Sequence, residues 1–252
     1  MQNREMTFAL TIAGFDGSAG AGILADIKAM EYFGVYGQAV CTATTVQNEN
    51  EFIAPDWILW ERIEAQLEAL AAVRDFNAVK IGLVEKLSVL KKIVHKVRKL
   101  FPNALLVWDP IFSATSGYRF FKTTNDLDEF LPILPELDLL TPNQEEFNLL
   151  GLGLLASRGE RGIGDTVSVL LKGGHANGSD CSDILMHRGG RYKFTSERVP
   201  GIGKHGTGCA VSAAIVANLA LGKSIPEACA EAKKYMDLYL VSGSGRLAFV
   251  RK

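Results

Sequence analysis

The stretch Phe8-Ala9-Leu10-Thr11-Ile12-Ala13 is almost entirely apolar and ends at Gly14. A short apolar run that stops at a glycine is typical of a buried β-strand. After a glycine-rich turn, residues 22–33 carry apolar side chains at helical spacing, so a helix is predicted there. This strand–turn–helix unit is the first of several along the chain, and it indicates an α/β fold.

The same alternation continues along the sequence. Further strands are predicted over residues 39–46, 78–82, 105–108, 137–140 and 167–171, and further helices over 57–73, 87–100, 207–221 and 224–241. Apolar strands that alternate with helices favour a mostly parallel sheet covered on both faces. We see no repeat or linker, so residues 1–252 are expected to form one three-layer α/β/α domain. Residues 151–166 fit this pattern least and are expected to form a loop or a short irregular helix.

The composition excludes several classes of function. The chain has 252 residues, of which 48% are hydrophobic and 22% charged, as in ordinary globular proteins. Its formal net charge of −1 provides no field for nucleic acid or an anionic membrane, and neither partner is expected. The four cysteines form no C-x-x-C pair, which argues against zinc and suits a reducing compartment. Because the apolar start lacks a signal-peptide layout, we expect a cytoplasmic protein.

Polar residues follow several of the predicted strands. In open parallel sheets, ligands bind beyond the carboxyl ends of the strands. These polar residues are therefore expected to converge on one edge of the sheet. They are Asp16, Gln47, Asn48, Asp109, Asn143, Glu146 and Lys172.

The turn Gly203-Lys204-His205-Gly206-Thr207-Gly208-Cys209 leads directly into a helix of small residues. Free backbone N–H groups and the helix N-terminus together form an anion site. The same field is expected to lower the pKa of the Cys209 thiol. A phosphate site beside an acid–base group points towards phosphoryl transfer. The alternative is an ordinary helix cap with an inert buried cysteine.

Two other strand ends carry candidate phosphate or metal ligands. Asn143 and Glu146 lie three residues apart at a helix start, where they could hold Mg²⁺ directly or through water. The alternative is a helix start stabilised by acidic residues. Lys172 precedes two glycines and could neutralise a polyphosphate, or it could be a solvated lysine in a turn. The turn over residues 14–22 matches neither the dinucleotide-binding pattern nor the Walker pattern. The alternative to a ligand-binding role for this turn is a tight strand-to-helix turn capped by Asp16.

The ordered motifs resemble the hydroxymethylpyrimidine and phosphomethylpyrimidine kinases of thiamine biosynthesis, in the ribokinase-like superfamily. They are residues 10–14 (LTIAG), 21–28 (AGILADIK), 46–48 (VQN), 80–83 (KIGL), 109–110 (DP), 141–143 (TPN), 172–175 (KGGH) and 205–209 (HGTGC). The resemblance covers nearly the whole chain. It implies ATP-dependent phosphorylation of the pyrimidine hydroxymethyl group and then of the monophosphate, with Mg²⁺, by a homodimer.

The resemblance also implies roles for residues on the pyrimidine side. Gln47 is similar to the family glutamine that hydrogen-bonds the aminopyrimidine ring. Asp16, Leu83 and Ile111 match positions that line the same pocket.

On the phosphate side, Asn143 and Glu146 match an N-x-x-E element associated with magnesium and phosphates, and Lys172 matches a phosphate-side lysine. Gly206, Thr207 and Gly208 match the anion hole. Cys209 matches the catalytic cysteine, where many sugar kinases carry aspartate. A thiolate there would accept the hydroxyl proton while backbone N–H groups and magnesium stabilise the transferred phosphoryl group.

The sequence departs from the family pattern in ways that keep two alternatives open. Ala19 replaces a glycine of the usual S-G-G-A-G and is expected to narrow the pocket beside the bulky Phe15. The last residues also lack the glycine-rich, histidine-containing pattern common in the family. One alternative is a pyridoxal or pyridoxine kinase of the same fold, against which Gln47 argues. The other is a non-catalytic pyrimidine sensor, against which the intact phosphate-side residues argue.

Overall fold

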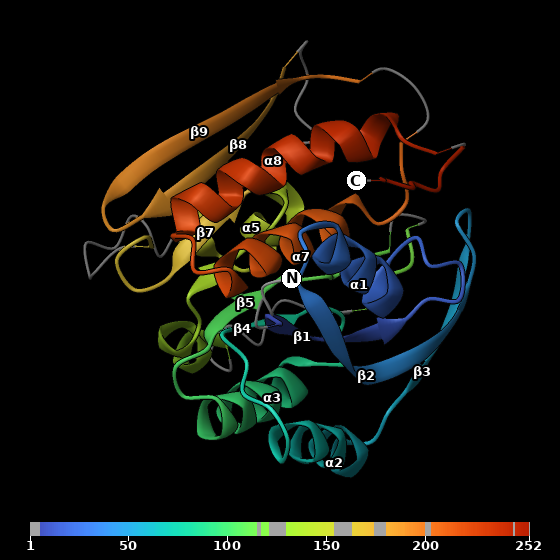
Figure 1. The fold of residues 1–252 in the computed structure, drawn as a ribbon, viewed down its shortest axis with the longest axis vertical. Helices are drawn as coiled ribbons and strands as arrows, with labels where there is room; N and C mark the ends of the chain where they lie inside the picture. Colours follow the sequence, from blue (N-terminus) through green and yellow to red (C-terminus); the bar gives the residue numbers. More distant parts are fainter. Residues whose placement is uncertain are drawn as a thin grey trace, which may run out of the picture.

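The fold is built on one nine-stranded sheet with the order β3-β2-β1-β4-β5-β6-β7-β8-β9 (Figure 1). This computed structural model describes residues 6–114, 117–120, 130–153, 163–173, 180–199, 203–243 and 245–251. The strands are β1 (Phe8–Phe15), β2 (Tyr36–Gln47), β3 (Phe52–Trp57), β4 (Ala78–Ile81), β5 (Leu105–Trp108), β6 (Leu139–Leu140), β7 (Ser168–Leu171), β8 (Asp180–His187) and β9 (Gly190–Glu197). Six neighbouring strands of the sheet run parallel to one another, namely β2, β1, β4, β5, β6 and β7. This confirms the mostly parallel sheet.

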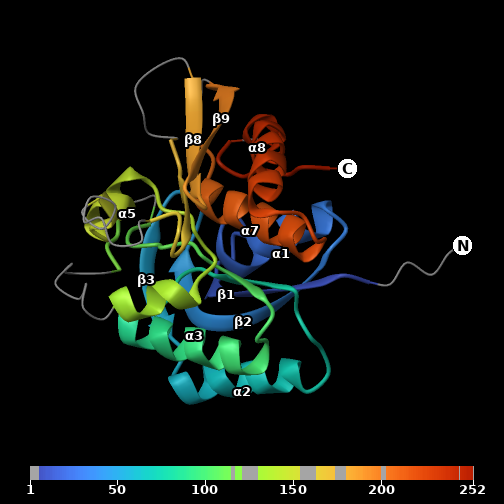
Figure 2. The same cartoon turned by 90° about the vertical axis from the view of Figure 1, so that its left-hand side faces the viewer.

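Helices cover both faces of the sheet, so the predicted three layers are confirmed (Figures 1 and 2). One face carries α1 (Gly22–Tyr32), α7 (Thr207–Ala220) and α8 (Ile225–Val241). The other carries α2 (Trp60–Ala71), α3 (Leu87–Leu100) and the 3₁₀ helix η1 (Leu131–Glu136). None of the described helices combines the length and the apolar character needed to cross a membrane.

Helix α7 is the central helix of its layer. Every residue from Cys209 to Ala220 is buried, because α7 lies between the sheet and the helices α1 and α8. A helix that is apolar on all sides is buried on all sides, and small side chains permit close packing. This packing fixes the start of α7 at the carboxyl ends of the parallel strands.

The sequence patterns missed the antiparallel strands at both edges of the sheet. Trp57 ends β3, whereas the helix that was predicted from residue 57 begins at Trp60. Strands β8 and β9 pair as a hairpin, and most side chains of β9 are at least partly exposed. Such edge strands carry polar residues and lack the continuous apolar run that marks a buried strand.

The short helix α5 (Gln144–Leu149) begins at the predicted helix start that follows β6. Residues 154–162 of the irregular stretch, and Gly174 and His175 of the KGGH motif, lie outside the described residues.

Candidate active site

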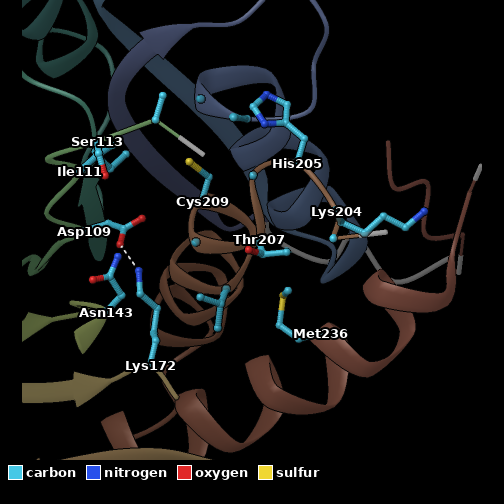
Figure 3. A pocket seen from close by; sticks show the side chains of 18 of the residues that line it. Asp109, Ile111, Ser113, Asn143, Lys172, Lys204, His205, Thr207, Cys209 and Met236 are labelled. Carbon is cyan, nitrogen blue, oxygen red and sulfur yellow. Dashed lines mark hydrogen bonds and ion pairs between the residues drawn. The ribbon is translucent and has the colours of Figure 1, made fainter. Parts of the chain in front are cut away.

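A cavity of about 640 Å³ opens at the carboxyl ends of the parallel strands, beside the first turn of α7 (Figure 3). It brings together all of the predicted site residues except Asp16 and Asn48. The Asn48 side chain instead accepts hydrogen bonds from the backbone N–H groups of the turn after β2. The residues that line the cavity as predicted are Gln47, Leu83, Asp109, Ile111, Asn143, Glu146, Lys172, Gly206, Thr207, Gly208 and Cys209. Figure 3 shows Asp109, Asn143 and Lys172 grouped on one side of the cavity, with Met236 and Lys204 on the other.

The glycine-rich turn has a backbone that only glycine tolerates. Gly206 has a left-handed φ of 71°, and a Cβ there would lie 2.0 Å from the Gly20 carbonyl oxygen. Two glycine-containing turns therefore pack directly against each other. Because α7 starts at Thr207, the first N–H groups of the helix have no partner within it. They lie at the cavity, as an anion site requires.

Asp109 and Lys172 form an ion pair of 2.7 Å opposite this turn. A Cβ on Gly208 would lie 3.3 Å from the Lys172 Nζ, so the turn and the ammonium are neighbours. Asp109 also accepts hydrogen bonds from the hydroxyls of Thr141 and Ser212, both at 3.0 Å. Burial alone would lower the pKa of Lys172, but the nearby carboxylates of Asp109 and Glu146 hold it above its ordinary value. Lys172 is thus a permanent positive charge beside the glycine-rich turn over residues 203–209, which we call the anion turn.

Asn143 and Glu146 form the capping box of α5. The Asn143 Oδ1 accepts from the Glu146 N–H at 2.9 Å, and the Glu146 Oε2 accepts from the Asn143 N–H at 2.7 Å. The alternative interpretation of these residues, as a stabilised helix start, is therefore confirmed. The capping box uses only one oxygen of the Glu146 carboxylate. Within the described part of the chain, the Glu146 Oε1 receives no hydrogen bond, and this oxygen remains available to a ligand.

Burial raises the pKa of Glu146 to about 7, against the opposing charge of Lys172. The folded state thus binds a proton that the unfolded chain releases near pH 4.5, so stability is lost as pH rises from about 4.5 to 7. We expect wild-type stability to fall by about 1 kcal/mol per pH unit in this window relative to Glu146→Gln, which keeps the cap but cannot ionise. Urea unfolding of both proteins at several pH values measures the difference. A difference that does not change with pH would contradict this role.

Cys209 lies buried in the first turn of α7, and its thiol differs from the expectation. Burial raises the pKa of this thiol to about 11, and the nearby Lys80 ammonium only partly opposes the effect. The predicted lowering by the helix field is therefore wrong. The cause is the burial of Cys209 itself, which is only 7% exposed.

Behind Cys209 lies a fully buried ion pair. The Lys80 ammonium on β4 contacts the Asp26 carboxylate on α1, and neither side chain is exposed. Thr11 on β1 donates a 2.6 Å hydrogen bond to the same carboxylate. Lys80 also donates to the Cys209 carbonyl oxygen at 3.4 Å. Three elements thus meet beneath the anion turn.

The far end of the cavity is mostly apolar, with Gln47 as its main polar group. Leu83, Ile111, Phe52 and Phe120 line it, and the two phenylalanine rings meet edge to face at 5.0 Å. The Gln47 Nε2 donates to the Thr45 hydroxyl at 2.7 Å, which fixes the side-chain amide. The amide is therefore oriented before any ligand binds.

Asp16 does not line the cavity. Its carboxylate accepts hydrogen bonds from the backbone N–H groups of Ser18 and Ala21 and pairs with the His205 Nε2 at 3.0 Å. Burial alone would raise the pKa of Asp16, but these hydrogen bonds lower it below its ordinary value. The bond with His205 has the largest lowering effect. Asp16 caps the first glycine-containing turn, as the alternative interpretation supposed, and it also joins that turn to the second one through His205.

Ala19 does not line the cavity either, so the expectation that it narrows the pocket is wrong. It has a left-handed φ of 57°, which costs an alanine about 1 kcal/mol relative to glycine. Its departure from the usual glycine therefore affects the backbone of the turn.

Comparison with known proteins places these features in a family. The sequence profile of the phosphomethylpyrimidine kinase family matches residues 16–244. The chain is 34% identical to the hydroxymethylpyrimidine/phosphomethylpyrimidine kinase of Rhizobium meliloti, over 95% of this chain and 92% of that protein. It is 33% identical to the protein of the same name from Aquifex aeolicus, over 90% and 92% of the two chains.

Solved structures share the same architecture. The pyridoxal kinase from Staphylococcus aureus in complex with ADP superposes with a TM-score of 0.81, at 26% identity, over 95% of this chain and 90% of that chain. The phosphomethylpyrimidine kinase of Clostridium difficile superposes with a TM-score of 0.73, at 32% identity, over 92% and 98%. Sequence identity is thus higher to the second, and the fold is ribokinase-like. The chain belongs to the phosphomethylpyrimidine kinase family.

Proposed function

We propose that the protein transfers a phosphoryl group from ATP to 4-amino-5-hydroxymethyl-2-methylpyrimidine and then to its monophosphate. One observation carries this proposal most: the anion turn and the Lys172–Asp109 pair face each other at one end of a cavity whose other end is apolar and contains Gln47. An aminopyrimidine ring fits the apolar end, and its hydroxymethyl group then points towards the anion turn.

The residues around the reacting atoms act mainly by position and charge. The N–H groups of Thr207 and Gly208 and the Lys172 ammonium stabilise the charge that develops on the transferred phosphoryl group. Cys209 accepts the proton of the substrate hydroxyl. Because burial keeps this thiol protonated at neutral pH, only a small thiolate fraction is ready to react.

Magnesium would be held on the Asn143–Glu146 side of the cavity. The Glu146 Oε1 is the available carboxylate oxygen, and the described residues contain no cluster of three or more His, Cys, Asp or Glu suited to a metal. One carboxylate, water and substrate phosphates are the ligands that Mg²⁺ usually takes in such sites. Bound there, the ion would neutralise phosphate charge.

The test is ADP formation from ATP with a panel of substrates. We expect faster turnover of hydroxymethylpyrimidine than of pyridoxal or pyridoxine, and product analysis shows whether the monophosphate is phosphorylated again. Faster turnover of pyridoxal would favour the pyridoxal kinase alternative, to which the Staphylococcus aureus structures point. Calorimetric binding of the pyrimidine without ADP formation would favour a sensor.

Gln47→Ala is expected to weaken pyrimidine binding about tenfold, because a buried ring would lose a hydrogen-bond partner. Titration calorimetry with hydroxymethylpyrimidine measures the dissociation constant. Asn50→Ala, in the exposed turn after β2, is the matched control and should bind like wild type. An unchanged dissociation constant in Gln47→Ala would remove this residue from substrate recognition.

We also propose a cytoplasmic homodimer. Val46 on β2 and Ile53 on the neighbouring edge strand β3 are 58% and 55% exposed and provide apolar surface for a second copy. Sedimentation velocity measures the mass in solution. Nucleic acid and membranes are not proposed as partners, on the near-neutral net charge.

A further inference from the structure

The positive charges around the cavity are mostly occupied by protein groups. Lys80 is paired with Asp26, Lys172 with Asp109, and Lys233 with Asp183 at 2.9 Å. Lys204 donates to the carbonyl oxygens of Gly245 and Leu247, at 2.9 and 3.2 Å.

Arg246 is different. This residue lines the cavity, and the Nε of its side chain is buried without a hydrogen-bond partner. Among the described residues, no carboxylate or carbonyl oxygen accepts from its guanidinium. A buried donor without a partner is costly, and a guanidinium is suited to bind phosphate oxygens in pairs. The side chain therefore has the properties of a ligand group whose ligand is anionic.

The C-terminal segment is folded so that Arg246 is held at this place. Gly243 and Gly245 have left-handed φ angles of 68° and 55°, which turn the chain after α8 back towards the cavity. The Arg246 carbonyl oxygen accepts from the His205 N–H at 2.8 Å, and Lys204 binds the carbonyls on either side. The segment is thus attached to the anion turn by three hydrogen bonds.

The position of Arg246 indicates which substrate it meets. Its backbone is bonded to His205, within the anion turn, and its neighbours Gly245 and Leu247 bind the Lys204 side chain. Figure 3 shows Met236 and Lys204 across the cavity from Ile111 and Ser113, on the side away from the pyrimidine end. We infer that Arg246 binds a phosphate group of the nucleotide donor. This inference rests on the proposed kinase activity and adds a residue to its nucleotide site.

Titration calorimetry of wild type and Arg246→Gln with ADP and with adenosine tests the inference. We expect Arg246→Gln to bind ADP about tenfold more weakly, to bind adenosine and hydroxymethylpyrimidine like wild type, and to show a raised KM for ATP. Arg246→Lys keeps the charge and should recover part of the ADP affinity. Arg251→Gln is the matched control, because Arg251 lies on the same segment, exposed, over the Phe249 ring.

The outcomes separate the inference from the proposed function. Unchanged ADP binding in Arg246→Gln, with normal binding in wild type, would overturn the inference alone. Equal losses for ADP and adenosine would overturn the assignment to phosphate. A wild-type protein that binds no ADP would overturn both. A thermal unfolding midpoint of Arg246→Gln equal to that of wild type would show that the segment is still folded.

Discussion

Replacing Cys209 with alanine is expected to lower kcat by about 10²- to 10⁴-fold, the usual contribution of a positioned general base. Pyrimidine and ADP binding should change little, because the backbone N–H groups of the anion turn remain in place. Steady-state turnover and titration calorimetry measure the two effects separately. Cys229→Ala is the matched control, since this second buried cysteine lies on α8 and does not line the cavity.

The raised thiol pKa gives this prediction a signature in pH. Cys209 must be deprotonated to accept a proton, and burial raises its pKa to about 11. Above pH 7, where Glu146 is ionised, kcat/KM should therefore rise about tenfold per pH unit, in proportion to the thiolate. In Cys209→Asp, whose carboxylate is ionised at neutral pH, the rise above pH 7 should disappear. A flat wild-type profile above pH 7, or full turnover in Cys209→Ala, would exclude the thiolate as the base.

The second large effect is expected on stability, from Lys80→Met. This change leaves the Asp26 carboxylate buried and without its counter-charge, because neither side chain is exposed. Breaking a buried pair in this way costs about 3–5 kcal/mol, a large part of the stability of a typical domain. Urea unfolding measures the loss.

Two further variants separate the charge effect from a simple loss of packing. The triple variant Lys80→Met, Asp26→Leu, Thr11→Val removes the whole polar cluster and should recover most of the lost stability. Lys86→Met, an exposed lysine paired with Glu85, should change stability by less than about 1 kcal/mol. A triple variant no more stable than Lys80→Met would show that shape, and not charge, dominates at this position.

The buried part of the fold was predictable because its strands and helices have strong patterns. Strand β5 (Leu105–Trp108) and helix α3 (Leu87–Leu100) have the predicted bounds, since a continuous apolar run and a helical apolar stripe each have one simple solution. The β8–β9 hairpin was missed because its side chains are partly solvated and its pattern is weak.

The positions of the strand ends predicted that the polar residues of the site lie close together. They did not predict the burial and the hydrogen-bond partners of each side chain. Asp16 and Asp109 both follow apolar strands, yet only Asp109 lines the cavity, and the difference arises from turn geometry. The pKa of Cys209 depends on packing by segments far away in the sequence. Arg246 follows no strand, and the sequence gives no pattern that would single it out.

The contact between the two glycine turns has a consequence for how the molecule is assembled. The Asp16–His205 pair joins residues 189 positions apart. Lys204 then binds the segment that holds Arg246, which lies still nearer the end of the sequence. Contacts of such long sequence separation close the largest loops and form late in folding. The strands β1, β2 and β4 and the helices α2 and α3 can therefore associate first, because shorter stretches of chain separate them, and the nucleotide end of the cavity is the last part to mature. A folding intermediate should already protect β1 and β4 from hydrogen exchange while still unable to retain ADP.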